Sequence, residues 1–125
     1  MGEKKTYVID GHRFTNLDEF YDEISQMMLP ETFWGRNLDA FNDILRGNFG
    51  PIDDSDFVII WKNSELSKQR LGYAETVKFL ELIHNRRGHD KSRELEAAKK
   101  GEGDTIFDWL VNIILEKKHI ELRLE

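Results

Sequence analysis

The residues with the clearest potential for chemistry are two aspartates, Asp39 and Asp43, which lie four residues apart. If residues 37–46 form a helix, this spacing places both carboxylates on the same face. Like charges at this spacing destabilise a helix by about 0.2–0.5 kcal/mol. The helix dipole favours Asp39 in the first turn, but Asp43 lies too far along to benefit. Such a pair can meet the cations of a partner, serve as acid and base, bind a metal ion, or simply be solvated.

The same stretch separates into an apolar side and a polar side. Helical geometry places Leu38, Phe41, Ile44 and Leu45 on the side to be buried, and Asp39, Asn42, Asp43 and Arg46 on the other. A solvated helix face is the ordinary explanation, with Arg46 partly neutralising Asp43. Aromatic residues before and after the helix, Phe33-Trp34 and Phe49, favour a binding surface instead, because interfaces combine aromatic anchors with charges. The same aromatics can equally fold into the core, as we expect for Trp34.

The elements around this helix predict an α/β fold. Apolar periodicity and capping signals predict a strand at 6–10, a helix from an N-cap at Asn16 to before Pro30, and the helix at 37–45. A strand at 57–61, buried on both faces, follows, and then helical structure from Ser64 to His84 with a possible break at Gly72. The chain continues with a helix at 105–118, covered on most sides, and a strand at 119–125. Strands separated by helices predict a small three-stranded parallel sheet packed with about four helices.

The whole chain, residues 1–125, suits one domain. Residues 89–104 are polar, and we expect a mobile loop or a poorly anchored helix there. Trp61 and Trp109 are best explained as core residues. These elements leave the outward face of residues 37–46 as the main candidate site.

Composition narrows the classes of function. The net charge is −6, which disfavours direct binding to nucleic acid and suits a basic protein partner. No apolar run is long enough for a membrane span, and the absence of cysteine is compatible with a reducing cytoplasm. The turn at Gly11-His12 lacks a phosphate-binding glycine pattern, and His84 and His89 have no metal-ligand spacing. We therefore expect no cofactor.

Two groups of residues together resemble the barstar family of ribonuclease inhibitors. The first group surrounds the aspartates and the second follows the strand at 57–61: Leu29-Pro30-Glu31, Gly35, Asn37-Leu38-Asp39-Ala40 and Asp43, then Trp61, Glu65 and Ser67-Lys68-Gln69. The resemblance covers residues 6–70 well and 104–125 by pattern only. Residues 71–103 have little counterpart, which implies a flexible insertion at about 89–104 before the last helix.

The resemblance implies a barstar-like fold and an intracellular inhibitor of a bacterial ribonuclease. In the family, the second helix and the loop before it fill the enzyme's active site. The helix carboxylates take the place of the RNA phosphate and pair with catalytic Arg, His and Lys residues. Carried over by position, Asp43 is the principal phosphate mimic, Asp39 its partner and Phe33 an aromatic contact. The full set of expected partner-binding residues is Asp39, Asp43, Phe33, Asn37, Asn42, Arg46, Gly47 and Asn48.

Four positions depart from the family pattern. Asn42 and Asn48 stand where barstar has tryptophan, Asn112 aligns loosely with a glutamate that contacts the enzyme, and Arg36 replaces an acidic residue. These departures imply a retuned surface, so the partner is either a barnase-like enzyme or another nuclease toxin.

Three hypotheses follow for the function. The first is a cytoplasmic immunity or antitoxin protein of a bacterium, monomeric when free, that inhibits a basic extracellular or delivered ribonuclease. The second is an interaction module of the same fold whose partner is not a ribonuclease. The third is an enzyme that uses Asp39 and Asp43, and it is the weakest, since no site with acid and base contrast can be argued.

Overall fold

The computed structural model describes residues 5–28, 34–46, 56–84 and 90–125. Along the chain the elements are β1 (Lys5–Asp10), the 3-10 helix η1 (Gly11–Arg13), α1 (Leu17–Met28), α2 (Leu38–Leu45), β2 (Phe57–Lys62), α3 (Ser64–Arg70), α4 (Tyr73–His84), α5 (Ser92–Lys99), α6 (Ile106–Leu115) and β3 (Ile120–Leu124). The predicted positions of the three strands and of the helix at 37–45 are confirmed.

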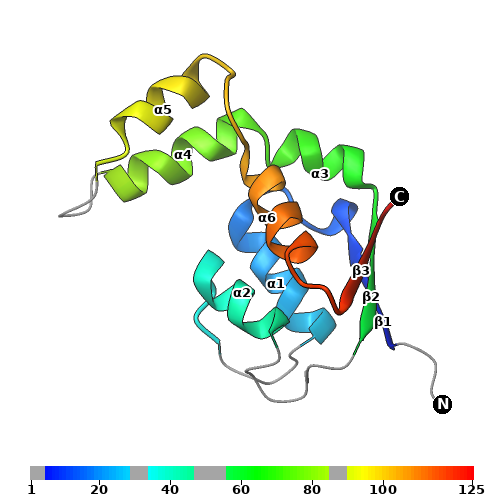
Figure 1. Cartoon of the computed structure of the whole chain (residues 1–125). Helices are drawn as coiled ribbons and strands as arrows, with labels where there is room; N and C mark the ends of the chain where they lie inside the picture. Colours follow the sequence, from blue (N-terminus) through cyan, green and yellow to red (C-terminus); the bar gives the residue numbers. More distant parts are fainter. Residues whose placement is uncertain (1–4, 29–33, 47–55, 85–89) are drawn as a thin grey trace.

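The three strands form one parallel sheet, as predicted, and their order in the sheet is β1-β2-β3. Tyr7 lies beside Ile59, which in turn lies beside Leu122. Helices α1, α2 and α6 lie on one side of this sheet (Figure 1). On the other side of β2, Val58 is buried and Ile60 is half-buried, so the prediction of a strand buried on both faces is only partly right. The described residues contain six α-helices, against about four predicted.

Aromatic side chains fill the space between the sheet and the helices. Trp61 is fully buried and stacks on Phe20, with 5.5 Å between the ring centroids. Its indole N–H donates to Ser67 Oγ at 2.9 Å, which satisfies the polar end of the ring. Trp34 is also buried, as predicted, and its indole N–H donates to Ser25 Oγ at 2.7 Å. Trp109 differs from the prediction, because it is only half-buried at the edge of this core.

The first long helix begins at the predicted N-cap. Asn16 Oδ1 accepts a hydrogen bond from Glu19 N at 2.8 Å. The Glu19 carboxylate reaches one residue further back than the usual capping box, to the backbone N–H and hydroxyl of Thr15, both at 2.7 Å. These capping hydrogen bonds fix the position of α1, and side chains of α1 form one wall of the candidate site.

Helices α4 and α5 pack side by side and project from the sheet and the other helices (Figure 1). We call this pair the helical arm. Gly72 lies between α3 and α4, at the predicted break. Leu95 and Ala98 of α5 are buried against Leu80 of α4 and form a small second core. The segment predicted as a mobile loop or a poorly anchored helix therefore contains a helix with two buried residues. Its flexibility stays a prediction.

Candidate partner-binding surface

Helix α2 is fixed at its first residue by the side chain before it. Asn37 is the N-cap, and its Oδ1 accepts from Ala40 N at 2.8 Å. Ala40, Phe41, Ile44 and Leu45 are buried, which anchors the apolar side of the helix in the core. An exposed helix of only eight residues would be marginal in water, so this cap and this buried side hold it in place.

The polar side of α2 carries four of the predicted site residues. Asp39 and Arg46 are exposed, while Asn42 and Asp43 are half-buried. Among the described residues no cation lies within 4.0 Å of either carboxylate, so the expected ion pair between Arg46 and Asp43 is not formed. The two aspartates therefore leave their negative charge available on this face.

Asn42 is in contact with a lysine from the other end of the chain. Lys117 Nζ donates to Asn42 Oδ1 and, at 3.0 Å, to Ile113 O. Lys117 is 8% exposed, and this burial lowers the pKa of its ammonium group. The charge of Arg46 also lowers this pKa, while the charges of Glu116 and Asp43 raise it. A buried cation thus lies within the electrostatic reach of Asp43.

Sequence reasoning missed Lys117. The neighbouring Lys118 is exposed, and the sequence offers no signal that distinguishes the two lysines. The two lysines differ because the turn between α6 and β3 packs against α2 and brings Lys117 to Asn42. These residues are 75 positions apart in the sequence.

The end of α2 is tied to the same turn. The His119 ring nitrogen Nε2 lies 2.9 Å from Leu45 O, so its N–H can donate to this carbonyl at the last turn of the helix. The His119 ring also packs edge-on against Phe57, with centroids 5.6 Å apart. Both ends of α2 are therefore held by side chains, Asn37 at the start and His119 at the finish.

Arg36 connects the residues before α2 to α1. Its guanidinium donates to Asp18 O at 3.1 Å and forms an ion pair with the Asp22 carboxylate at 2.6 Å. Arg36 itself has a φ of 52°, in the left-handed region that costs energy for a residue with a side chain. Because Asp22 balances its charge, Arg36 reduces the negative charge of α2 less than its position in the sequence predicts.

Three predicted site residues, Phe33, Gly47 and Asn48, lie outside the described residues, and their roles stay predictions. Asn112 is exposed on α6. His84 Nδ1 accepts from Lys91 N at 3.1 Å, so it joins the two helices of the arm, and His89 lies outside the described residues. The described ranges contain no group of three or more side chains that could hold a metal ion. They also contain no helix of sufficient length and apolar character to cross a membrane.

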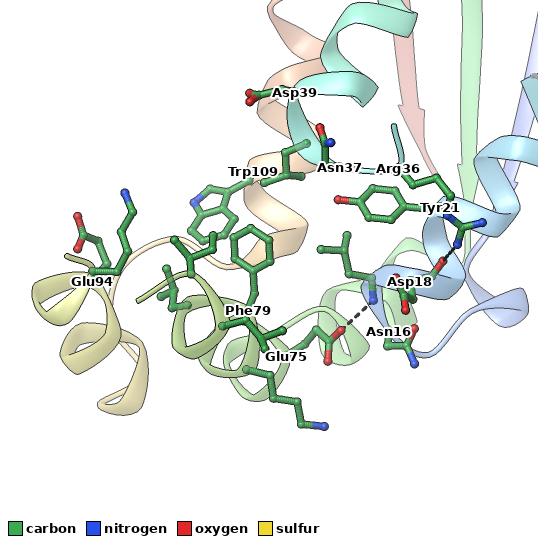
Figure 2. Close-up of a pocket in the computed structure, with 17 residues that line it drawn as sticks. Asn16, Asp18, Tyr21, Arg36, Asn37, Asp39, Glu75, Phe79, Glu94 and Trp109 are labelled. Carbon is green, nitrogen blue, oxygen red and sulfur yellow. Dashed lines mark hydrogen bonds between the residues drawn. The ribbon is translucent and has the colours of Figure 1, made fainter. Parts of the chain in front are cut away.

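A cleft of about 1000 Å³ opens between the helical arm and the helices α1 and α2 (Figure 2). Asp39 and Leu38 line it from α2, Tyr21 from α1, Phe79 from α4 and Trp109 from α6. Burial, with a contribution from the Asp18 carboxylate, raises the pKa of the Tyr21 hydroxyl far above its ordinary value. The hydroxyl is therefore neutral at any physiological pH. The sequence predicted no cleft, because it indicated Leu38 on the buried side of its helix and Trp109 in the core.

The sheet, its covering helices and the polar side of α2 form a small α/β domain with an acidic helix at its surface. Comparison with known families agrees, because the model of the barstar family, described as "Barstar (barnase inhibitor)", matches residues 4–100. The chain belongs to the barstar family, and this membership points to an inhibitor protein, not an enzyme. The matched range does not by itself locate an insertion, so the insertion expected at about 89–104 stays a prediction.

One curated relative agrees with this assignment. The protein named "Putative ribonuclease inhibitor YrdF" from Bacillus subtilis (strain 168) is 36% identical over 77 residues. The similarity covers 61% of this chain and 78% of the relative.

Proposed function

We propose that this protein binds a bacterial ribonuclease and blocks its active site with helix α2. The family and the relative's name support an inhibitor of ribonucleases. In this proposal the carboxylates of Asp43 and Asp39 occupy the positions that RNA phosphates take in the free enzyme. The protein acts in the bacterial cytoplasm as an immunity protein or antitoxin, against an enzyme that is secreted or delivered.

The single observation that carries the proposal is the state of the two aspartates on α2. Both belong to the polar side of a helix that is fixed at each end, and neither has an ion pair within the described residues. A ribonuclease must hold cationic side chains where its substrate's phosphate binds. Docking α2 into such a site would relieve the repulsion between Asp39 and Asp43 and would satisfy the enzyme's cations.

The rigidity of α2 adds to the affinity expected for such a complex. A binding helix that frays in the free protein must be ordered on association, and this ordering weakens binding. Asn37 at the start of α2 and His119 at its end limit such fraying. The carboxylates are therefore held in position before the partner arrives.

Asn42 and Lys117 indicate a partner that differs from barnase. The side chain at position 42 is an amide engaged by a buried lysine, where the family resemblance expects an indole at the interface. A partner of this surface must tolerate a cation near Asp43. Either a ribonuclease related to barnase or a nuclease toxin of another fold meets this condition.

The test is an inhibition assay on a panel of purified bacterial ribonucleases, with barnase included. We expect potent inhibition of at least one enzyme, and we expect a mononucleotide phosphate that occupies the active site to compete with the protein. Inhibition should weaken as salt is raised, because screening reduces the attraction between opposite charges. Binding without loss of activity, or without competition, would favour the alternative of an interaction module with another kind of partner.

A further inference from the structure

The polar face of helix α2 is divided into an acidic stripe and a stripe of hydrogen-bond donors. Asp39 and Asp43 lie four residues apart and form the acidic stripe. Asn42 and Arg46 have the same spacing, and the helical backbone continues to the C-cap Arg46, so they form a second stripe beside the first. We call this second stripe the donor stripe. The proposed function gives a role to the acidic stripe alone.

Lys117 determines which end of the Asn42 amide faces outward. A lysine ammonium group has three donors and no acceptor, so it must meet Oδ1 of Asn42 and not Nδ2. Its second hydrogen bond, to Ile113 O at 3.0 Å, holds the ammonium group in place. Because the two ends of a planar amide point in different directions, Nδ2 of Asn42 is turned away from Lys117.

The outward end of the Asn42 amide is accessible. None of the hydrogen bonds formed within the described residues has Asn42 Nδ2 as its donor. No buried side-chain nitrogen in the same part of the chain lacks a hydrogen-bond partner, so Nδ2 is in contact with solvent. Two N–H donors are therefore presented next to Asp43 and are available to a partner.

Positive charge is concentrated around this amide. Lys117 lies behind Asn42, and its charge interacts with that of Arg46. Arg46 is exposed and forms no ion pair within 4.0 Å in the described ranges. Two cations and an amide N–H2 group together suit a carboxylate, which accepts several charge-assisted hydrogen bonds. A partner surface that is cationic throughout would be repelled by this stripe.

From these observations we infer that the donor stripe binds an acidic side chain of the same ribonuclease that α2 inhibits. This acid lies beside the cations that face the acidic stripe. Asn42 Nδ2 and the Arg46 guanidinium donate to its carboxylate, and Lys117 is a positioning residue that orients the amide. The inference rests on the proposed function for the identity of the partner, but the orientation of the amide can be tested without any ribonuclease.

The first experiment measures the orientation of the amide by NMR in the isotope-labelled, free, full-length protein. We expect a scalar coupling across the hydrogen bond between Lys117 Nζ and Asn42 Cγ, and its loss in Asn42→Leu. The ammonium group of Lys118 is the internal control, because it is exposed and exchanges rapidly with water. A visible Lys117 ammonium signal without this coupling would overturn the inference. Exchange of the Lys117 ammonium as rapid as that of Lys118 would overturn it too, since the group would then be open to water.

The second experiment measures the dissociation constant of Asn42→Asp with the most sensitive ribonuclease of the panel. Aspartate keeps an oxygen acceptor for Lys117 but replaces the outward N–H2 group by a carboxylate oxygen. We expect the constant to rise by about 10-fold, because the new charge faces the acid of the partner. A partner that offers only cations would bind this variant more tightly, so the two kinds of partner give changes of opposite sign. Gln69→Glu adds the same charge at an exposed position of α3 and should change the constant by less than about 3-fold.

Replacement of the exposed cation gives an independent measurement. Arg46→Gln should raise the dissociation constant by about 5-fold, because a charge-assisted hydrogen bond is lost. Lys68→Gln is the matched control, since it removes an exposed cation of α3 and should change the constant by less than about 3-fold. Urea denaturation of each variant verifies that it is folded.

The acid of the partner can be located by replacing the acidic residues that border the ribonuclease's phosphate site with amides. Binding is measured in place of inhibition, because such replacements can abolish catalysis. With one of these enzyme variants, we expect Asn42→Asp to bind as tightly as the wild-type inhibitor or more tightly. If every enzyme variant retains the full 10-fold loss, the acceptor is not an acidic side chain and the inference is overturned.

Two further results separate this inference from the proposed function. If the wild type inhibits a ribonuclease, but Asn42→Asp or Arg46→Gln binds as tightly as the wild type or more tightly, the inference is overturned and the proposed function stands. If the wild type inhibits no ribonuclease of the panel, the proposed function and the partner inferred from it are both overturned, whatever the orientation of the amide.

Discussion

Lys117 donates a hydrogen bond to Asn42 across 75 residues of sequence, and this contact joins the turn before β3 to the exposed face of α2. Lys117 also donates to Ile113 O, so one buried ammonium group satisfies two oxygen atoms. The contact explains how asparagine fits at a position where the family resemblance expects tryptophan. It also places a cation near Asp43.

Replacement of Lys117 by methionine should destabilise the protein. The aliphatic part of the side chain is kept, but the oxygen atoms of Asn42 and Ile113 lose a buried donor. We expect the free energy of unfolding to fall by about 1–3 kcal/mol, as measured by urea denaturation. Lys118→Met is the matched control and should change it by less than about 0.5 kcal/mol, because Lys118 is exposed. Equal effects of the two substitutions would show that the contact with Asn42 is not structural.

Loss of the N-cap of α2 should reduce both stability and inhibition. Asn37→Ala removes the acceptor for Ala40 N, which should cost about 1 kcal/mol of unfolding free energy and should fray the first turn, where Asp39 lies. Asn37→Ser retains a capping oxygen and should restore most of both properties. If serine fails to rescue inhibition while it rescues stability, Asn37 contacts the partner directly, as the family resemblance implies.

Neutralising Asp39 should leave the free protein nearly unchanged. Asp39→Asn relieves the repulsion from Asp43 but also removes a favourable charge from the first turn of α2, and each effect is a few tenths of a kcal/mol. We therefore expect a change within about 0.5 kcal/mol in urea denaturation. A marked loss of stability would mean that Asp39 has a structural role, which its exposure does not suggest.

The carboxylate of Glu19 should contribute a pH-dependent part of the stability. Hydrogen bonds from the Thr15 hydroxyl and the Thr15 backbone N–H lower the pKa of Glu19 below its ordinary value of 4.5. At a pH between the lowered pKa of Glu19 in the folded protein and its ordinary pKa in the unfolded chain, the unfolded chain binds more protons than the folded one. The free energy of unfolding therefore rises with pH in this range. The contribution is therefore present above pH 4.5 and is lost as the pH falls through the lowered pKa.

This prediction can be checked by comparing the wild type with Glu19→Gln in denaturation experiments from pH 6 down to pH 3. The difference in unfolding free energy should shrink as the pH falls. A difference that is independent of pH would show that the charge of Glu19 does not contribute.

Local sequence signals were sufficient for most of the fold. The N-cap Asn16 bonds its helix as expected, the helix predicted at 37–45 begins after Asn37, and the break at Gly72 separates α3 from α4. The parallel direction of the strands follows from their separation by helices, and it is confirmed. These features depend on residues close in sequence or on simple topological rules, so a single sequence is sufficient to predict them.

Features that depend on contacts distant in sequence were not predictable. The helix α5 lies in a polar segment, and its two buried residues are apparent only once Leu80 of α4 packs against them. Trp109 was assigned to the core because α6 is apolar on most sides, yet the projection of the arm leaves it at the edge of a cleft. For the site, α2 and the two aspartates on its polar side were predicted, whereas Lys117 and the cleft required the structure.

The most direct test of the central claim is the dissociation constant of the complex between this protein and the ribonuclease it inhibits best, measured for Asp43→Ala and for Glu65→Ala. Both substitutions remove one negative charge, so long-range attraction is reduced equally, but only Asp43 lies on the polar face of α2. We expect Asp43→Ala to weaken binding on the order of 100-fold, because it leaves the enzyme's phosphate-binding cations buried without a partner. Glu65→Ala should change the constant by less than about 3-fold. Equal affinities of the two variants would contradict the account of Asp43 as a phosphate mimic.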